Sequence, residues 1–103
     1  MPQKRPPPYV RLIERLGSVS VWLVDGSYVR SHIDADFGEF GHRYSVAAIP
    51  RQEVWLDAEP AGDAPGSLAR RALIERRLMA RGMDYEAART VAIAEERKQR
   101  ERA

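Results

Sequence analysis

The amino-acid sequence predicts a single α+β domain: an N-terminal helix, a four-stranded antiparallel sheet and a C-terminal helical hairpin. Residues 19–57 are rich in strand-forming Val, Trp and Tyr and are interrupted by turn residues. Residues 67–103 carry apolar side chains at helical spacing around a Gly-containing turn. At 103 residues and 44% hydrophobic content, the chain has room for one domain with a thin core, which we place at residues 9–103.

The first sixteen residues divide into an arm and a helix. Residues 1–8 are basic and rich in proline, which predicts a flexible arm in an extended polyproline conformation. Residues 9–16 predict a short amphipathic helix, because apolar residues recur at i, i+3, i+4 and i+7: Tyr9, Leu12, Ile13 and Leu16. Such a helix covers either the domain's own sheet or the groove of a partner protein.

Residues 19–57 predict four antiparallel strands. Residues 19–24 and 28–33 flank Asp25-Gly26, which is the strongest short hairpin signal. Residues 43–49 and 53–57 follow as the third and fourth strands, separated by a turn that contains Pro50. We expect helices to pack on one apolar face of this sheet, formed by Trp22, Val24, Tyr44, Val46, Val54 and Leu56.

The last third of the chain predicts a linker and two helices. Residues 58–66 have the composition of a linker, and Ser67 is a suitable N-cap for the helix that follows. Gly82 suits the left-handed position after that helix, and Asp84 can cap the next one. Residues 95–102 contain no apolar side chain and are expected to project into solvent, where Glu96 and Arg100 pair at i, i+4.

Composition restricts the compartment and the class of function. The chain has no cysteine, so disulfides, Cys-based zinc sites and thiol nucleophiles are excluded, and a reducing compartment is indicated. It also lacks an apolar run of about 20 residues and an N-terminal apolar leader, which predicts a cytoplasmic protein without membrane contact. The net charge of +2 combines an acidic middle with two basic ends. These charges can be satisfied within the molecule, which is the leading interpretation, by neighbouring subunits or by an anionic partner.

A cluster of carboxylates and imidazoles in residues 32–42 is a candidate metal site. On an extended strand, His32, Asp34 and Asp36 would point the same way, and His42 follows shortly after them. The spacing matches no established calcium or zinc signature. A metal-dependent hydrolase that uses this cluster is therefore one alternative function, although we predict no cofactor or metal for the leading one.

A basic helix face gives a second alternative. Arg70, Arg77 and Arg81 would share one face of the first hairpin helix, and the tight turn resembles a helix-turn-helix. Lys4 and Arg5 could add phosphate contacts from the arm. The other arginines of the hairpin alternate with glutamates, which is typical of a solvated surface. A small nucleic-acid-binding protein is thus the second alternative.

Residues 22–95 resemble a small, largely uncharacterised family of bacterial and phage proteins that carry a zincin-like helix. The resemblance depends on these segments: Trp22-Leu23-Val24-Asp25-Gly26, Glu53-Val54-Trp55-Leu56-Asp57, Glu75-Arg76-Arg77-Leu78-Met79, Gly82-Met83 and Tyr85-Glu86-Ala87-Ala88. The family pattern is His-Glu-Leu-x-Glu-Arg-x-Leu-Met, with a further His after the Tyr-x-x-Ala of the next helix. Its chemically active positions fall on Arg71, Ala72, Glu75 and Arg89, so only Glu75 is retained.

These substitutions remove the chemistry that the resemblance implies. A zinc site needs imidazole or carboxylate ligands and a base, whereas Arg71 and Arg89 offer no lone pair and Ala72 offers no base. We expect an ion-pair cluster of Arg71, Glu75 and Arg89 where the family holds its site. The sequence departs from the family at Phe40 also, where a second Gly is usual, and this puts the role of His42 in question.

The leading interpretation is a pseudoenzyme: a non-enzymatic interaction or structural protein on a degenerate zincin-like scaffold. We expect a protein partner or a homo-oligomer, in the cytoplasm or, for a phage protein, in a larger virion-associated assembly. The remnant site comprises Arg71, Glu75, Arg89 and His42. The expected contact residues are Lys4, Arg5, Leu12, Ile13, Arg70, Arg77 and Arg81.

Overall fold

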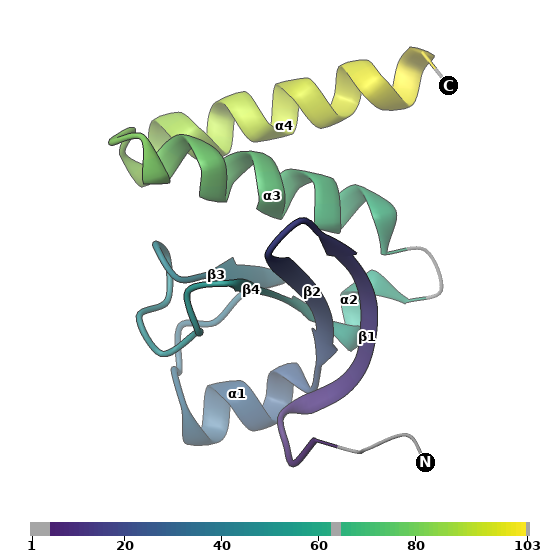
Figure 1. The fold of residues 1–103 in the computed structure, drawn as a ribbon, viewed down its shortest axis with the longest axis vertical. Coiled ribbons are helices and arrows are strands. Elements are labelled where there is room, and N and C mark those ends of the chain that lie inside the picture. Colours follow the sequence, from purple (N-terminus) through teal and green to yellow (C-terminus); the bar gives the residue numbers. More distant parts are fainter. Residues whose placement is uncertain (1–4, 63–64, 103) are drawn as a thin grey trace.

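A mixed four-stranded sheet lies between helices in the computed structural model, which describes residues 5–62 and 65–102 (Figure 1). The elements follow in this order along the chain: β1 (Tyr9–Leu16), β2 (Val19–Val24), α1 (Gly26–His32), β3 (Phe40–His42), β4 (Glu53–Asp57), α2 (Ala58–Ala61), α3 (Gly66–Ala80) and α4 (Tyr85–Arg102). The strand order is β1-β2-β4-β3. The α+β class is confirmed, whereas the expected all-antiparallel sheet is wrong because β2 and β4 run parallel.

Both faces of the sheet are covered. Val21 pairs with Val54 and Leu23 with Leu56, and these side chains pack against α3 through Leu68, Ala69 and Ala72. On the opposite face, Val24 and Trp55 pack with Val29 of α1 and with Phe37, Val46 and Ile49 of the following loops. Figure 1 shows α1 on one side of the sheet and α3 on the other, with α4 stacked on α3. The expected one-sided sheet is therefore wrong.

Residues 9–16 form a strand and not the expected helix. β1 pairs antiparallel with β2, and its register shifts between Tyr9 and Arg11 and again between Leu12 and Glu14. Each shift adds one residue to β1, which moves the following side chains to the other face of the sheet. The two bulges thus produce an apolar spacing that imitates a helix, because Tyr9 packs in one core cluster and Ile13 in the other.

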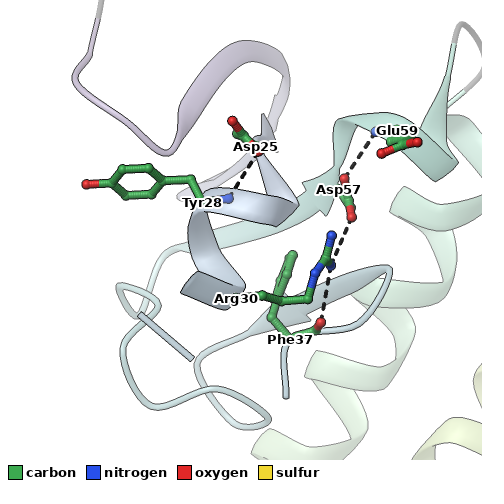
Figure 2. Close-up of polar contacts among 6 residues, drawn as sticks. All are labelled: Asp25, Tyr28, Arg30, Phe37, Asp57 and Glu59. Carbon is green, nitrogen blue, oxygen red and sulfur yellow. Dashed lines mark hydrogen bonds and ion pairs between the residues drawn. The ribbon is translucent and has the colours of Figure 1, made fainter. Parts of the chain in front are cut away.

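The Asp25-Gly26 pair begins a helix and does not close a hairpin. The Asp25 carboxylate accepts a hydrogen bond from the Tyr28 amide at 3.1 Å, which makes Asp25 the N-cap of α1 (Figure 2). The expected second strand at residues 28–33 is therefore wrong. Asp-Gly satisfies a helix start as well as a turn, and the local sequence does not distinguish the two.

The third expected strand, residues 43–49, is a loop of successive turns. The amides of Ser45 and Val46 both donate to the His42 carbonyl, at 3.0 and 2.8 Å, so the chain turns away as soon as β3 ends. Val46 and Ile49 are buried from this loop, which explains why their spacing resembled a strand. The fourth expected strand is confirmed as β4.

The C-terminal helical hairpin is confirmed as α3 packed on α4. Gly82 has a φ of 103°, and Asp84 accepts from the Ala87 amide at 2.9 Å, so both predicted turn signals hold. The Nε atom of Arg100 lies 3.5 Å from the Oε2 atom of Glu96, so the ion pair expected from their spacing is present, although Glu96 is buried. Ser67 is not the N-cap, since α3 begins at Gly66 after Pro65. None of the described helices has the length and apolar character that a membrane crossing requires.

Described residues of both the predicted linker and the predicted arm contact the domain. Asp57 caps the short helix α2 within residues 58–66, of which residues 63–64 lie outside the described part. Residues 1–4 of the arm lie outside it as well. Arg5, by contrast, pairs with Glu53 at 3.1 Å, and the Pro8 carbonyl accepts from the Asp25 amide at 2.8 Å. Residues 5–8 are therefore held against the sheet.

Asp57 connects β4 to α1 and α2 where the parallel strands β2 and β4 end (Figure 2). Its carboxylate accepts from Arg30 of α1 at 3.1 Å and from the Glu59 amide of α2 at 3.1 Å. Arg30 also donates to the Phe37 carbonyl at 3.3 Å. Gly26 packs directly on the buried Asp57 carboxylate, where a Cβ atom would overlap it. The start of α1 therefore requires glycine for close approach.

Replacing Gly26 by alanine is expected to lower the free energy of unfolding by about 2 kcal/mol, because the added methyl group displaces Asp57 or α1. Urea denaturation followed by circular dichroism measures the loss. Gly38→Ala is the matched control, since a Cβ at Gly38 meets no heavy atom within 4 Å. Equal unfolding midpoints for the two variants would contradict this packing.

Candidate functional site

A cavity of about 540 Å³ opens between the loop on either side of β3 and the α3–α4 hairpin. We call it the Glu75 pocket. Two rows of side chains at i, i+4 spacing form its helical wall: Arg71, Glu75 and Met79 on α3, and Tyr85 and Arg89 on α4. The opposite wall consists of Asp36, Gly38, Glu39, Phe40, Tyr44, Ser45 and Val46.

Glu75, which lines the pocket, makes an almost completely buried contact with His42. The Nε2 atom of His42 lies 2.8 Å from the Oε1 atom of Glu75, and their side chains are 0% and 1% exposed. The contact joins the end of β3 to the middle of α3. Gly41, next to His42, allows β3 to pack closely on the opposite face of the sheet, because a Cβ there would lie 2.9 Å from Ile49 Cδ1.

The loop after β3 fixes the tautomer of His42. The Tyr44 amide donates to Nδ1 at 3.2 Å, so the imidazole proton lies on Nε2 and is donated to Glu75. The Ser45 hydroxyl bonds the backbone of His42, accepting from its amide at 3.1 Å and donating to its carbonyl at 3.2 Å. Both ring nitrogens are thus engaged, and neither is free to bind a metal or accept a substrate proton.

The Glu75 carboxylate and the Arg71 guanidinium are only partly satisfied. Glu75 Oε2 is buried and has no hydrogen-bond partner among the described residues, and the same holds for Arg71 Nε. The Arg71 guanidinium carbon lies 5.6 Å from the centre of the Phe40 ring. Two residues that line one pocket, four apart on one helix, therefore carry an unfilled acceptor and an unfilled donor.

The structure brings the predicted remnant site together but connects it differently. Arg71, Glu75 and Arg89 line one pocket, and His42 contacts Glu75. The expected ion-pair cluster is wrong, because no guanidinium nitrogen of Arg71 or Arg89 lies within 4.0 Å of a Glu75 oxygen in the described chain. Burial selects His42 as the partner, since it reaches Glu75 from the sheet whereas Arg89 is exposed.

Several pocket residues were not among the predicted site residues. Met79 lies four residues after Glu75, and Tyr85 lies four before Arg89, so helical spacing alone could have identified both. Tyr44 and Ser45 could not be found that way. Their role depends on the turns that follow β3, and these replaced an expected strand.

The candidate metal cluster of residues 32–42 is dispersed. His32 is in the last turn of α1, where its exposed ring stacks on Tyr28 at 4.3 Å, and Asp34 and Asp36 are in the loop after it. The expected alignment of His32, Asp34 and Asp36 on one strand is therefore wrong. Among the described side chains, no group of three or more acidic or imidazole ligands is placed to hold a metal ion.

The predicted contact residues are spread over several surfaces. Arg70, Arg77 and Arg81 are exposed, and the first two line a second groove, which lies between α3, α4 and the end of β1. Leu12 and Ile13 are half-buried in β1. Arg5 is held by Glu53, and Lys4 lies outside the described residues.

At the other end of the sheet, the Glu53 carboxylate accepts hydrogen bonds from three donors. Its carboxylate accepts from the Tyr9 hydroxyl at 2.6 Å and from the Trp55 indole at 3.0 Å, and it pairs with Arg5 at 3.1 Å. Burial, followed by the hydrogen bond to Glu53, raises the pKa of Tyr9 from 10.0 to about 12. The N-terminal residues are attached to the sheet through this cluster.

The chain matches no protein-family model, no curated protein and no solved structure. The resemblance to a zincin-like family therefore stays a prediction from the quoted segments. The chemistry of the pocket has to follow from its own geometry.

Replacing Glu75 by alanine is expected to lower the free energy of unfolding by about 3 kcal/mol, because it leaves the buried His42 Nε2–H unsatisfied and opens a void. Chemical denaturation measures this loss. Glu86→Ala, on the exposed side of α4, is the matched control and should cost about 0.5 kcal/mol. A similar cost for both variants would contradict the structural role of the His42–Glu75 contact.

Ionisation of Tyr9 is expected to lower the free energy of unfolding at alkaline pH. Because its folded pKa of about 12 exceeds the ordinary value of 10.0, its stabilisation is complete below pH 10 and disappears as the pH rises through 12. Urea midpoints of the wild type and of Tyr9→Phe should therefore converge across this window. Tyr85→Phe, whose ring is exposed, is the control, and a constant Tyr9→Phe difference would contradict the assignment.

Proposed function

We propose that the chain is a non-catalytic binding protein and that the Glu75 pocket receives a small polar group of its ligand. The observation that carries the proposal is the unpartnered Oε2 atom of Glu75, on a side chain that is 1% exposed. A buried acceptor without a partner costs about 1–3 kcal/mol, which a bound donor would recover. This favours an occupied pocket.

The engagement of His42 supports binding over catalysis. Its Nδ1 atom accepts from Tyr44 and its Nε2 atom donates to Glu75, so the imidazole has no free position for general acid–base chemistry. Ser45 contacts the His42 backbone and not the ring, and this arrangement activates no nucleophile.

Three residues at the catalytic positions of the zincin-like pattern also favour binding over catalysis: Arg71, Ala72 and Arg89. Arg71 and Arg89 in this pocket repel a metal cation but suit an anionic group of a ligand, and the methyl group of Ala72 is buried against the sheet. The proposal therefore extends the predicted pseudoenzyme: the scaffold keeps a pocket and uses it for recognition. A partner protein that presents a polar group to Glu75 would meet the same requirement.

Nuclear magnetic resonance of the ¹⁵N-labelled full chain tests this function. Mixtures of amino acids, carboxylic acids, amines, sugars and nucleotides are added at millimolar concentration. We expect amide shifts concentrated in residues 36–46 and 71–79, and at least a tenfold weaker response in Glu75→Gln. Glu86→Gln should respond like the wild type. A mixture series that shifts nothing, or that shifts Glu75→Gln equally, would overturn the proposal.

A further inference from the structure

The Glu75 carboxylate is best complemented by a hydrogen-bond donor that carries positive charge. Within residues 5–62 and 65–102, Glu75 receives one hydrogen bond, from the imidazole Nε2–H of His42, and its second oxygen is buried and free. Hydrogen bonds between oppositely charged groups are about twice as strong as neutral ones. An ammonium group is therefore the best complement to Oε2.

The arginines that line the pocket are best complemented by a hydrogen-bond acceptor that carries negative charge. Arg71 lies one helical turn before Glu75, and its buried Nε–H has no partner in the part of the chain that the structure describes. Arg89 lines the same pocket from α4. Guanidinium groups match carboxylates in shape and in hydrogen-bond geometry. A carboxylate is thus the complement to this wall.

The short distance between Glu75 and Arg71 along α3 indicates that one compact ligand carries both the ammonium and the carboxylate group. Side chains at i and i+4 of a helix have Cβ atoms about 5–6 Å apart, so groups that bind Glu75 and Arg71 must lie close together. The charge of the pocket agrees with one ligand that carries both groups, since a dianion would be repelled by the excess of carboxylates. Three carboxylates and two guanidinium groups line the pocket: Asp36, Glu39, Glu75, Arg71 and Arg89. The volume of about 540 Å³ is in the range of small-molecule sites.

We infer that the Glu75 pocket binds a free α-amino acid. Its ammonium group donates to Glu75 Oε2, its carboxylate accepts from Arg71 and Arg89, and its side chain rests on Phe40 and Met79. This inference rests on the proposed binding function and specifies its ligand class. A peptide end presents only one of the two charged groups on a single carbon, so a peptide satisfies half of the site.

Isothermal titration of the full chain with L-methionine and two analogues tests the ligand class. N-acetyl-L-methionine lacks the ammonium group, and L-methioninamide lacks the carboxylate. We expect L-methionine to bind, and each analogue to bind at least tenfold more weakly. The tripeptides Met-Gly-Gly and Gly-Gly-Met, which carry one group each at the methionine, should be weakened by a similar factor.

Two variants connect each ligand group to its residue. Glu75→Gln should weaken L-methionine at least tenfold and leave N-acetyl-L-methionine unchanged, whereas Arg71→Met should weaken L-methionine and leave L-methioninamide unchanged. Arg77→Met, which is outside the pocket on the same helix, is the control for the loss of an arginine. If Glu75→Gln does not fold, Arg71→Met and the analogue series still test whether the pocket binds a free amino acid.

The outcomes separate this inference from the binding function itself. Binding of an analogue or a tripeptide as tight as that of L-methionine overturns the amino-acid assignment and leaves a binding protein of another ligand class. Unchanged L-methionine binding in both variants overturns the assignment to this pocket. If no compound binds here or in the wider mixtures, both proposals fail.

Discussion

The contact between His42 and Glu75 connects the sheet to the helical layer, and the candidate site is built around it. His42 ends the short strand β3, Glu75 lies midway along α3, and the two side chains meet at 2.8 Å almost without exposure. A buried carboxylate is costly unless hydrogen bonds stabilise it, so the position of α3 on the sheet is restricted to one that keeps this contact. The surrounding Leu and Ala contacts with α3 are less directional and would tolerate other positions.

The same contact accounts for the chemistry of the pocket. The Tyr44 amide occupies Nδ1 of His42, so the imidazole supplies a single donor and satisfies a single oxygen of Glu75. The second oxygen stays buried without a protein partner in the described residues, beside an arginine whose Nε–H is also free. A zincin-like helix with ligands at these positions would fill such a space with a metal. Here Arg71 and Arg89 offer a metal ion no lone pair, and they suit an anionic group of a ligand.

A second polar contact performs the corresponding task on the other face of the sheet. Asp57, at the end of β4, holds Arg30 of α1 and caps α2, while Gly26 packs against its carboxylate. Parallel strands bring β2 and β4 to an end at the same edge, so one carboxylate reaches two helix starts there. Each face of the sheet is thus fixed by a buried carboxylate, and the one on α3 lines a cavity.

The sequence by itself determined the features that depend on local chemistry: the hairpin of α3 and α4 with its Gly82 and Asp84 signals, the strand β4, and the spacing that puts Arg71, Glu75 and Arg89 in reach of one site. The tertiary structure decided whatever depends on distant partners. The bulges of β1 exist only against β2, Asp25-Gly26 became a helix start beside Asp57, and Glu75 paired with His42, 33 residues away, in place of the arginines. Local patterns fit both outcomes in each case, and burial against the rest of the fold selected one.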